Sequence, residues 1–338
     1  MFLRWVYIPP LLIYVSAGVS GLTNIVGVFY LKDYLNLSAS FIASLGFWIG
    51  IPWSLKMPVG FLVDKYWRIR DYLVYLGSLI IFISLLIMFL LLTDRSFMEI
   101  YFEAEKWYII SAILTPIGYV IQDVVADAMT VEAVEGRFKK SNRNNKTIKL
   151  IKKEHTLLQM YGRFAIILGS LIVSIINLSM FNNVDISNKV QLNNTYANIY
   201  FYSLFIPFLS ISGIIANNFF NSKNVSINNK TSTLDYKIFY GSILFVVIAL
   251  FLGSSKIPYS QEIVLFTSLF LIAILMNFLM KTLDKNQRNT IIGTAIIIFV
   301  YRSIPGPGPG INWFEIDILN FDQAFLSLLS TIATSITL

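Results

Sequence analysis

The sequence predicts an all-α protein that crosses a membrane several times, and three observations lead to this prediction. Of its 338 residues, 56% are hydrophobic and only 13% are charged, whereas soluble domains are about a quarter charged. Apolar stretches of roughly 20 residues, enough for a helix to cross a hydrocarbon core, recur along the whole chain. The first stretch begins after Arg4 and continues to Leu31, which is too long for the core of a cleaved signal peptide.

The apolar stretches define the expected spans and their orientation. About ten transmembrane helices are expected, at residues 10–31, 40–62, 72–92, 107–134, 156–179, 197–219, 236–254, 261–281, 289–314 and 322–338. Lysine and arginine gather in alternate gaps between these spans, most densely in 137–153. Because basic loops remain in the cytoplasm, we expect a multi-pass protein of the cytoplasmic membrane with a cytoplasmic N-terminus. The net charge of +7 is therefore interpreted as an orientation signal rather than a nucleic-acid surface, and binding of anionic lipid by 137–153 is the alternative.

The composition also restricts the chemistry. The chain has no cysteine and one histidine, His155, so thiolate sites and histidine clusters are excluded and no metal or cofactor is expected. It contains no nucleotide-binding loop, which argues against ATP-driven transport by this chain.

An internal repeat organises the chain. The segment "KDYLNLSASFIASLG" at 32–46 resembles "IDILNFDQAFLSLLS" at 316–330, and both follow a first span and lead into a second. Transporters built from two similar halves show such repeats. We therefore expect a six-helix half at 1–220, a linker with two additional helices at 221–285, and the beginning of a second half at 286–338. By the offset, Leu338 corresponds to Ser54 inside a span, so the second half is expected to be incomplete.

Two spans carry ordered sets of polar and special residues. The second span and its following loop contain Pro52, Trp53, Lys56, Pro58, Gly60, Asp64, Lys65, Arg68 and Arg70. The fourth span, in "PIGYVIQDVVADAMTVEAVEG", contains Asp123, Asp127 and Glu132. The first set resembles the G-x-x-x-D-[RK]-x-G-[RK]-[RK] loop of the major facilitator superfamily, with Trp67 at the second glycine and Ile69 at one base. Together with "YRSIPGPGPGINWFEIDILNFD", the P-W-x-x-K-x-P-x-G-x-x-x-D and D-x-x-x-D-x-x-x-x-E patterns resemble the folate-biopterin transporter branch.

This resemblance implies a fold and a function. The fold would be a major facilitator-type helical bundle, here with two extra central helices and an incomplete second half. The function would be secondary active transport, with symport of protons and an organic anion such as a pterin or folate, and with no nucleic-acid partner. The resemblance assigns Gly60, Asp64, Lys65, Arg68 and Arg70 to a loop that moves between conformations. It leaves the cargo, the direction of transport and the oligomeric state open.

The acids of the fourth span are the candidates for proton coupling. Asp123 and Asp127 are four residues apart, so they lie on one face of a helix. Ionisable groups at this depth are expensive and usually face a cavity or a partner. In the superfamily this helix lines the central cavity, where an acid could take up and release a proton. The alternative is that Asp127 and Glu132 only extend to the membrane surface.

Cationic and amide groups in other spans are the candidates for substrate binding. Arg302 precedes "PGPGPG", whose prolines are expected to interrupt a helix at membrane depth. Its guanidinium suits a two-point contact with a carboxylate of the cargo, and Asn24 on the first span is a candidate hydrogen-bonding partner. The alternatives are that the turn is an external loop with Arg302 paired to an acid of this chain, and that Asn24 only joins helices. Lys56 is also assigned to substrate binding. Arg163, two turns into the fifth span, could pair with Asp127 or face the cavity.

Two other functional classes fit parts of the sequence. Asp123 and Asp127 could form the dyad of a membrane-embedded protease, but such dyads need facing helices, so we expect no enzyme. The incomplete second half favours the other alternative, a non-transporting fragment, membrane scaffold or receptor derived from a carrier.

Overall fold

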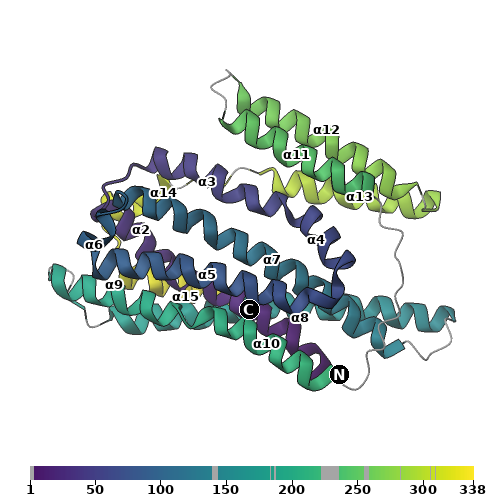
Figure 1. Cartoon of the computed structure of the whole chain (residues 1–338), viewed down its shortest axis with the longest axis horizontal. Helices are drawn as coiled ribbons and strands as arrows, with labels where there is room; N and C mark the ends of the chain where they lie inside the picture. Colours follow the sequence, from purple (N-terminus) through teal and green to yellow (C-terminus); the bar gives the residue numbers. More distant parts are fainter. Residues whose placement is uncertain are drawn as a thin grey trace.

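The computed structural model describes residues 4–138, 144–182, 184–185, 188–221, 236–254, 259–281, 283–304, 306–308 and 310–338. In these ranges the regular structure is helical, which confirms the predicted class (Figure 1). The α-helices are α1 (Ile8–Val19), α2 (Asn24–Asp33), α3 (Ala39–Ser54), α4 (Lys56–Lys65), α5 (Arg70–Thr93), α6 (Arg95–Glu99), α7 (Ala104–Phe138), α8 (Asn145–Phe181), α9 (Lys189–Ser203), α10 (Ile206–Asn221), α11 (Tyr236–Ser254), α12 (Ser260–Met280), α13 (Lys285–Arg302), α14 (Gly310–Asp317) and α15 (Gln323–Thr337). Short 3-10 turns are η1 (Trp5–Tyr7), η2 (Ser20–Thr23) and η3 (Trp67–Ile69).

Six helical segments of the described chain are long and apolar enough to cross a membrane. They are Trp5–Asp33, Ala39–Lys65, Trp67–Thr93, Ala104–Phe138, Lys146–Phe181 and Lys189–Phe219. The other four predicted spans correspond to shorter apolar helices in α11, α12 and α15, and to the separate helices α13 and α14. The structure therefore supports a helical membrane protein, whereas the number of ten spans is not confirmed.

The second span is bent at the position of its lysine. Pro58 has no N–H to donate to the carbonyl of Ser54, and its ring would clash with that carbonyl in a regular helix. The chain responds with a tighter turn in which the N–H of Leu55 donates to the carbonyl of Pro52 (3.0 Å). As a result α3 ends at Ser54, α4 begins at Lys56, and Lys56 lies at the bend.

Glycines set the closest helix crossings of the bundle. A Cβ on Gly18 of α1 would overlap the carbonyl oxygen of Ile166 on α8, and one on Gly169 would lie 2.7 Å from that of Val15. A Cβ on Gly77 of α5 would lie 2.8 Å from the carbonyl oxygen of Gly118 on α7. Small residues let helix backbones approach in a membrane, where packing replaces the hydrophobic effect as the force between helices.

Gln122, which lies beside the fourth-span acids in sequence, belongs to this packing. It is 1% exposed, donates to the Ser78 hydroxyl (2.8 Å) and accepts from Ser210 (2.9 Å). A buried amide needs such partners, and here they connect α7 to α5 and α10.

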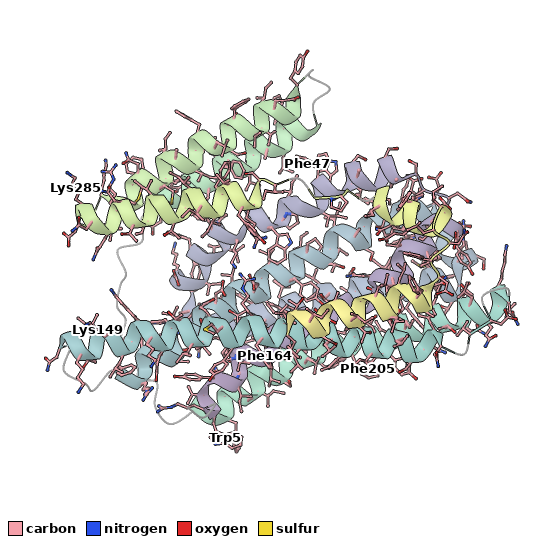
Figure 2. All side chains as sticks on the ribbon, turned by 180° about the vertical axis from the view of Figure 1, so that it is seen from behind. Trp5, Phe47, Lys149, Phe164, Phe205 and Lys285 are labelled. Atoms are coloured by element: carbon pink, nitrogen blue, oxygen red, sulfur yellow. The ribbon has the colours of Figure 1, made fainter. Side chains whose placement is uncertain are left out.

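The last helices pack on two sides of this bundle. α15 lies along α8, where the hydroxyls of Ser174 and Ser330 are 2.9 Å apart (Figure 2). α11 packs on α3 and α4, where Phe61 stacks on Phe239, and α12 packs on α11 (Figure 1). Lys149 and Lys285 lie at the same end of the molecule (Figure 2).

The two repeat segments have the same backbone geometry. Leu35 donates to the Tyr30 carbonyl and Leu319 to the Phe314 carbonyl, each at 3.2 Å. The next residues, Asn36 and Asn320, both adopt the left-handed conformation, with φ of 51° and 53°.

The following helices also begin alike. The Ser38 hydroxyl accepts from the Phe41 N–H (3.2 Å), and the Asp322 carboxylate accepts from the Phe325 N–H (2.7 Å), so each is an N-cap. The preceding helices are both interrupted, at η2 in the first copy and between α13 and α14 in the second. Pro305 and Pro309 lie outside the described residues. α13 ends at Arg302 and α14 begins at Gly310, so the two helices are separate, and the predicted depth of this interruption in the membrane stays a prediction.

The left-handed asparagines lead to a stability prediction. Asn36→Ala or Asn320→Ala is expected to lower the free energy of unfolding by about 1 kcal/mol, because a Cβ is disfavoured in this conformation and alanine lacks the local hydrogen bonding of asparagine. Glycine at either position should restore most of the loss. Thermal unfolding in detergent would measure this, with Asn144→Ala as control because Asn144 has negative φ and makes no capping bond. Equal losses for alanine and glycine would contradict it.

Candidate functional site

Lys56 forms a charge cluster with the two acids of the fourth span. Its Nζ lies 2.5 Å from Oδ2 of Asp123 and 2.8 Å from Oδ2 of Asp127. The Tyr14 hydroxyl of α1 donates to Oδ1 of Asp127 (2.5 Å). The four-residue spacing on α7 presents both carboxylates on one face, and the bend before α4 brings the lysine opposite them. The cluster therefore combines groups from α1, α4 and α7, with one cation for two carboxylates.

The two acids of the cluster lie near the middle of α7, and the cluster is open on one side. Asp123 lies 19 residues after Ala104 and 15 before Phe138, the ends of α7. The side chains of Lys56, Asp123 and Asp127 are 43%, 21% and 39% exposed. Lys56 and Asp127 of the cluster line a cleft of about 260 Å³, together with Gly60, Val63, Asp64, Val124, Ala128 and Val131. The charges thus face a space that water or a small ligand can reach.

The ion pair between Lys56 and the two acids was not predicted from the sequence. The sequence analysis assigned Lys56 to substrate binding and gave Arg163 as a possible ion-pair partner of Asp127. Lys56 pairs with both acids, and Arg163 makes no ion pair within the described chain and is exposed. Arg163 follows Gly162, whose backbone packs against the Tyr14 ring, so it lies near the cluster without joining it. The signal in the sequence was a lysine within an apolar span, which requires a counter-ion.

Arg302 and Asn24 are not brought together by a contact. Arg302 is the last residue of α13 and is exposed, and Asn24 is the exposed first residue of α2. No hydrogen bond or ion pair joins the two side chains among the contacts of the described chain. Their assignment to substrate binding remains a prediction.

The loop between the second and third spans is fixed to the fourth. Arg70 pairs with Glu132 at 2.6 Å and stacks over the Trp67 ring, 4.2 Å from its centroid. The Trp67 indole N–H also lies 3.4 Å from Glu132. Glu132 therefore has specific partners, which the alternative of a simple extension to the membrane surface does not provide. Trp67 contributes directly to this contact.

The other residues of this loop point elsewhere. Lys65 lies over the rings of Tyr66 and Tyr236, 5.3 and 5.7 Å from their centroids. Arg68 is exposed, Gly60 and Asp64 line the cleft, and Asp64 has no ion pair with any described residue.

A second charged group differs from the Lys56 cluster in its burial. Glu154 of α8 is 5% exposed, pairs with Arg137 of α7 and accepts a hydrogen bond from Tyr7 (2.9 Å). The sequence analysis did not single out these residues. A sealed and satisfied carboxylate of this kind is a structural contact between helices.

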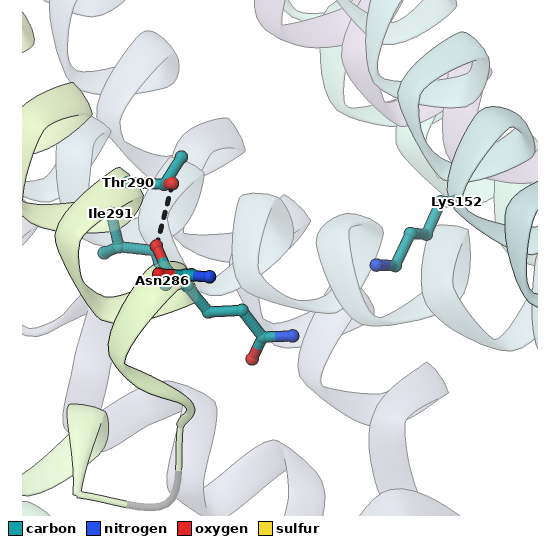
Figure 3. A pocket seen from close by; sticks show the side chains of 5 residues that line it. Lys152, Asn286, Thr290 and Ile291 are labelled. Atoms are coloured by element: carbon teal, nitrogen blue, oxygen red, sulfur yellow. Dashed lines mark hydrogen bonds between the residues drawn. The ribbon is translucent and has the colours of Figure 1, made fainter.

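A larger and more open cleft, of about 440 Å³, lies between α8 and the start of α13. It is lined by Lys152, Asn286, Gln287, Thr290 and Ile291 (Figure 3). Thr290 donates to the carbonyl of Asn286 within its own helix (2.9 Å). Lys152 faces this cleft from α8, and no carboxylate is among the lining residues.

The fold and the site define a helical membrane protein with a charge cluster inside its spans. Comparison with known protein families, with curated proteins and with solved structures found no significant match to this chain. The function is therefore inferred from the site.

Proposed function

We propose that this chain is a secondary carrier that moves a small organic anion together with protons, and that Lys56, Asp123 and Asp127 form its coupling site. The observation that carries the proposal is the lysine at the bend of the second span, which is shared by two carboxylates near the middle of α7 beside an open cleft. Ionisable groups within membrane spans are costly and mark ion or substrate pathways.

The exposure of Lys56 and Asp127 favours a functional role over a structural one. Glu154 shows what a structural carboxylate of this chain looks like, because it is 5% exposed and its partners seal it. Lys56 and Asp127, by contrast, are 43% and 39% exposed. Charges that only held helices together would gain from being sealed, whereas a carrier must let protons and cargo reach them.

The stoichiometry of the cluster suggests how coupling would work. With both acids ionised, Lys56 is neutralised and the cluster has one excess negative charge, which repels an anion. Protonation of one carboxylate removes that charge and frees part of the lysine for the cargo. Loss of the proton lets the carboxylate return to Lys56 and displaces the anion. One lysine thus cannot serve the cargo and both carboxylates at once, which is the basis of symport.

The proposed cargo rests on the charge of the site and on the sequence resemblance. The cationic lysine favours an anion, and the resemblance to folate-biopterin transporters in the second and fourth spans is the reason for naming pterins and folates. Placement in the cytoplasmic membrane rests on the alternation of basic loops. Two carboxylates that share one ammonium group, rather than one proton, are less suited to the protease alternative.

Replacing Asp123 by asparagine tests the proposal. The neutral amide would imitate the protonated acid, so Asp123→Asn should abolish uphill accumulation and retain exchange of cargo across proteoliposome membranes. Accumulation would be measured under an imposed pH gradient with labelled folate and pterin, and exchange without a gradient. Glu103→Gln is the control, because Glu103 is 76% exposed and pairs with Lys106 away from the cluster.

Two outcomes would contradict the proposal. Undiminished accumulation by Asp123→Asn would remove this residue from coupling. Binding of the cargo without any exchange or accumulation by the unchanged chain would favour the scaffold or receptor alternative.

A further inference from the structure

The cleft beside Lys56 extends along α4 and α7 to a third carboxylate. Lys56, Gly60 and Asp64 follow one another at intervals of four residues, so they lie along one face of α4. At 1.5 Å per residue, the two ends of this face are about 12 Å apart. Asp127, Ala128 and Val131 of α7 form the opposite wall. The cleft therefore connects the coupling site to Asp64 at the end of the span.

The dimensions of the cleft suit water. A volume of about 260 Å³ accommodates up to roughly eight water molecules at about 30 Å³ each. Charged groups stand at both ends, and Gly60 leaves the middle open, because a Cβ there would meet only Val124, at 3.8 Å. A chain of water molecules can carry a proton between groups that are too far apart for a direct hydrogen bond.

The charges around Asp64 leave it available for this task. Lys56 lies at the other end of the same α4 face, Asp127 lies on the opposite wall, and these two are paired with each other. Glu132, one residue after Val131, is held by Arg70, and Asp71 is bound by Arg70 and Asn218. The neighbouring Lys65 lies over aromatic rings, and Arg68 is exposed. Asp64 is the carboxylate of this group without an ion pair among the described residues.

We propose that the cleft is a water-filled proton route and that Asp64 accepts the proton at the end of the cleft farthest from Lys56. This rests on the proposed function, since it gives the path by which the coupling proton leaves. The proton taken up by the Asp123–Asp127 pair leaves from Asp127, the member of the pair that lines the cleft. The O–H bond of the protonated Asp127 carboxyl breaks, and the proton passes along the water chain, each water gaining one proton and giving up another. The Asp64 carboxylate accepts it and then releases it to bulk water at the basic end of the molecule, where Lys65 and Arg68 lie. Both carboxylates return to their ionised state.

The absence of cysteine allows a direct test of the water path. In the full chain, Ala128→Cys is expected to react with a small, membrane-impermeant thiol reagent added at the basic side. Adding Gly60→Leu, which fills the cleft, should slow this reaction at least tenfold. Gly50→Leu is the matched control, because Gly50 lies on α3 of the same span with no atom within 4 Å and does not line the cleft. Gly136→Cys, an exposed position near the end of α7, confirms access of the reagent.

A second measurement tests Asp64 itself. In proteoliposomes with an internal pH indicator, Asp64→Asn should slow proton movement coupled to labelled folate about tenfold and leave cargo exchange unchanged. A purely conformational role of Asp64 would slow both proton movement and cargo exchange.

No labelling of Ala128→Cys, or labelling unaffected by Gly60→Leu, overturns the water route. Labelling that behaves as expected while Asp64→Asn moves protons at the normal rate overturns the role of Asp64. If the unchanged chain moves no protons with cargo, the proposed function fails, while the labelling result still decides whether the route holds water.

Discussion

Replacing Lys56 by methionine is expected to weaken cargo binding strongly and to abolish accumulation. Asp123 and Asp127 would then lose their shared cation, and an anionic cargo would meet negative charge without a counter-ion. Removing one partner of a buried charge pair costs about 2–5 kcal/mol or more in binding. Because Lys56 is 43% exposed, we expect the low end of this range, about 2 kcal/mol or roughly a 30-fold weaker affinity.

Binding of labelled folate to purified protein would measure the effect of Lys56→Met. Lys106→Met is the control, since Lys106 is exposed and pairs with Glu103 away from the cluster. The double variant Lys56→Met with Asp127→Leu removes one charge of each sign and should recover protein yield without recovering binding. Recovery of binding in that variant would show that Lys56 serves only to neutralise the acids.

The second large effect is expected at the crossing of α1 and α8. Gly18→Ala would place a Cβ in overlap with the carbonyl oxygen of Ile166 and 3.0 Å from the Cα of Gly169, and both of these are backbone atoms. No side-chain rotation relieves such a contact, so the helices must separate. Overpacking typically costs about 1–3 kcal/mol, and the separation would also disturb the bond of Asn177 to the Leu22 carbonyl (3.2 Å).

The melting temperature in detergent and the fraction of monodisperse protein would measure the effect of Gly18→Ala. Gly136→Ala is the matched control on a helix, because no atom lies within 4 Å of a Cβ there. At that site the better helix propensity of alanine should leave stability equal or raise it by up to about 1 kcal/mol. A Gly18→Ala protein as stable as the unchanged chain would mean that α1 and α8 do not cross this closely.

The class of the protein could be predicted because it depends on local properties of the chain. A long apolar stretch satisfies its backbone hydrogen bonds within one helix, so composition and stretch length were enough to predict helical spans. The repeat was also visible in sequence, because its geometry is local. Asn36 and Asn320 terminate helices in the same conformation, and Ser38 and Asp322 begin the next ones. The number of ten spans was not confirmed, since α13 and α14 are separate helices and the apolar helices in α11, α12 and α15 are shorter.

The contacts between side chains of different helices could not be predicted in the same way. The sequence by itself determined that Lys56, Asp123 and Asp127 would lie within apolar helices, and that the two acids would share a face. Only the tertiary structure decided that Lys56 pairs with both of them, that Tyr14 joins them from α1, and that Arg163 remains outside. These contacts depend on the rotation and crossing of α1, α4, α7 and α8, which are fixed by the bend between Pro52 and Pro58 and by the close approach at Gly18 and Gly169. Helix periodicity shows which residues share a face of one helix. Which faces of two helices meet depends on packing among residues far apart in the chain.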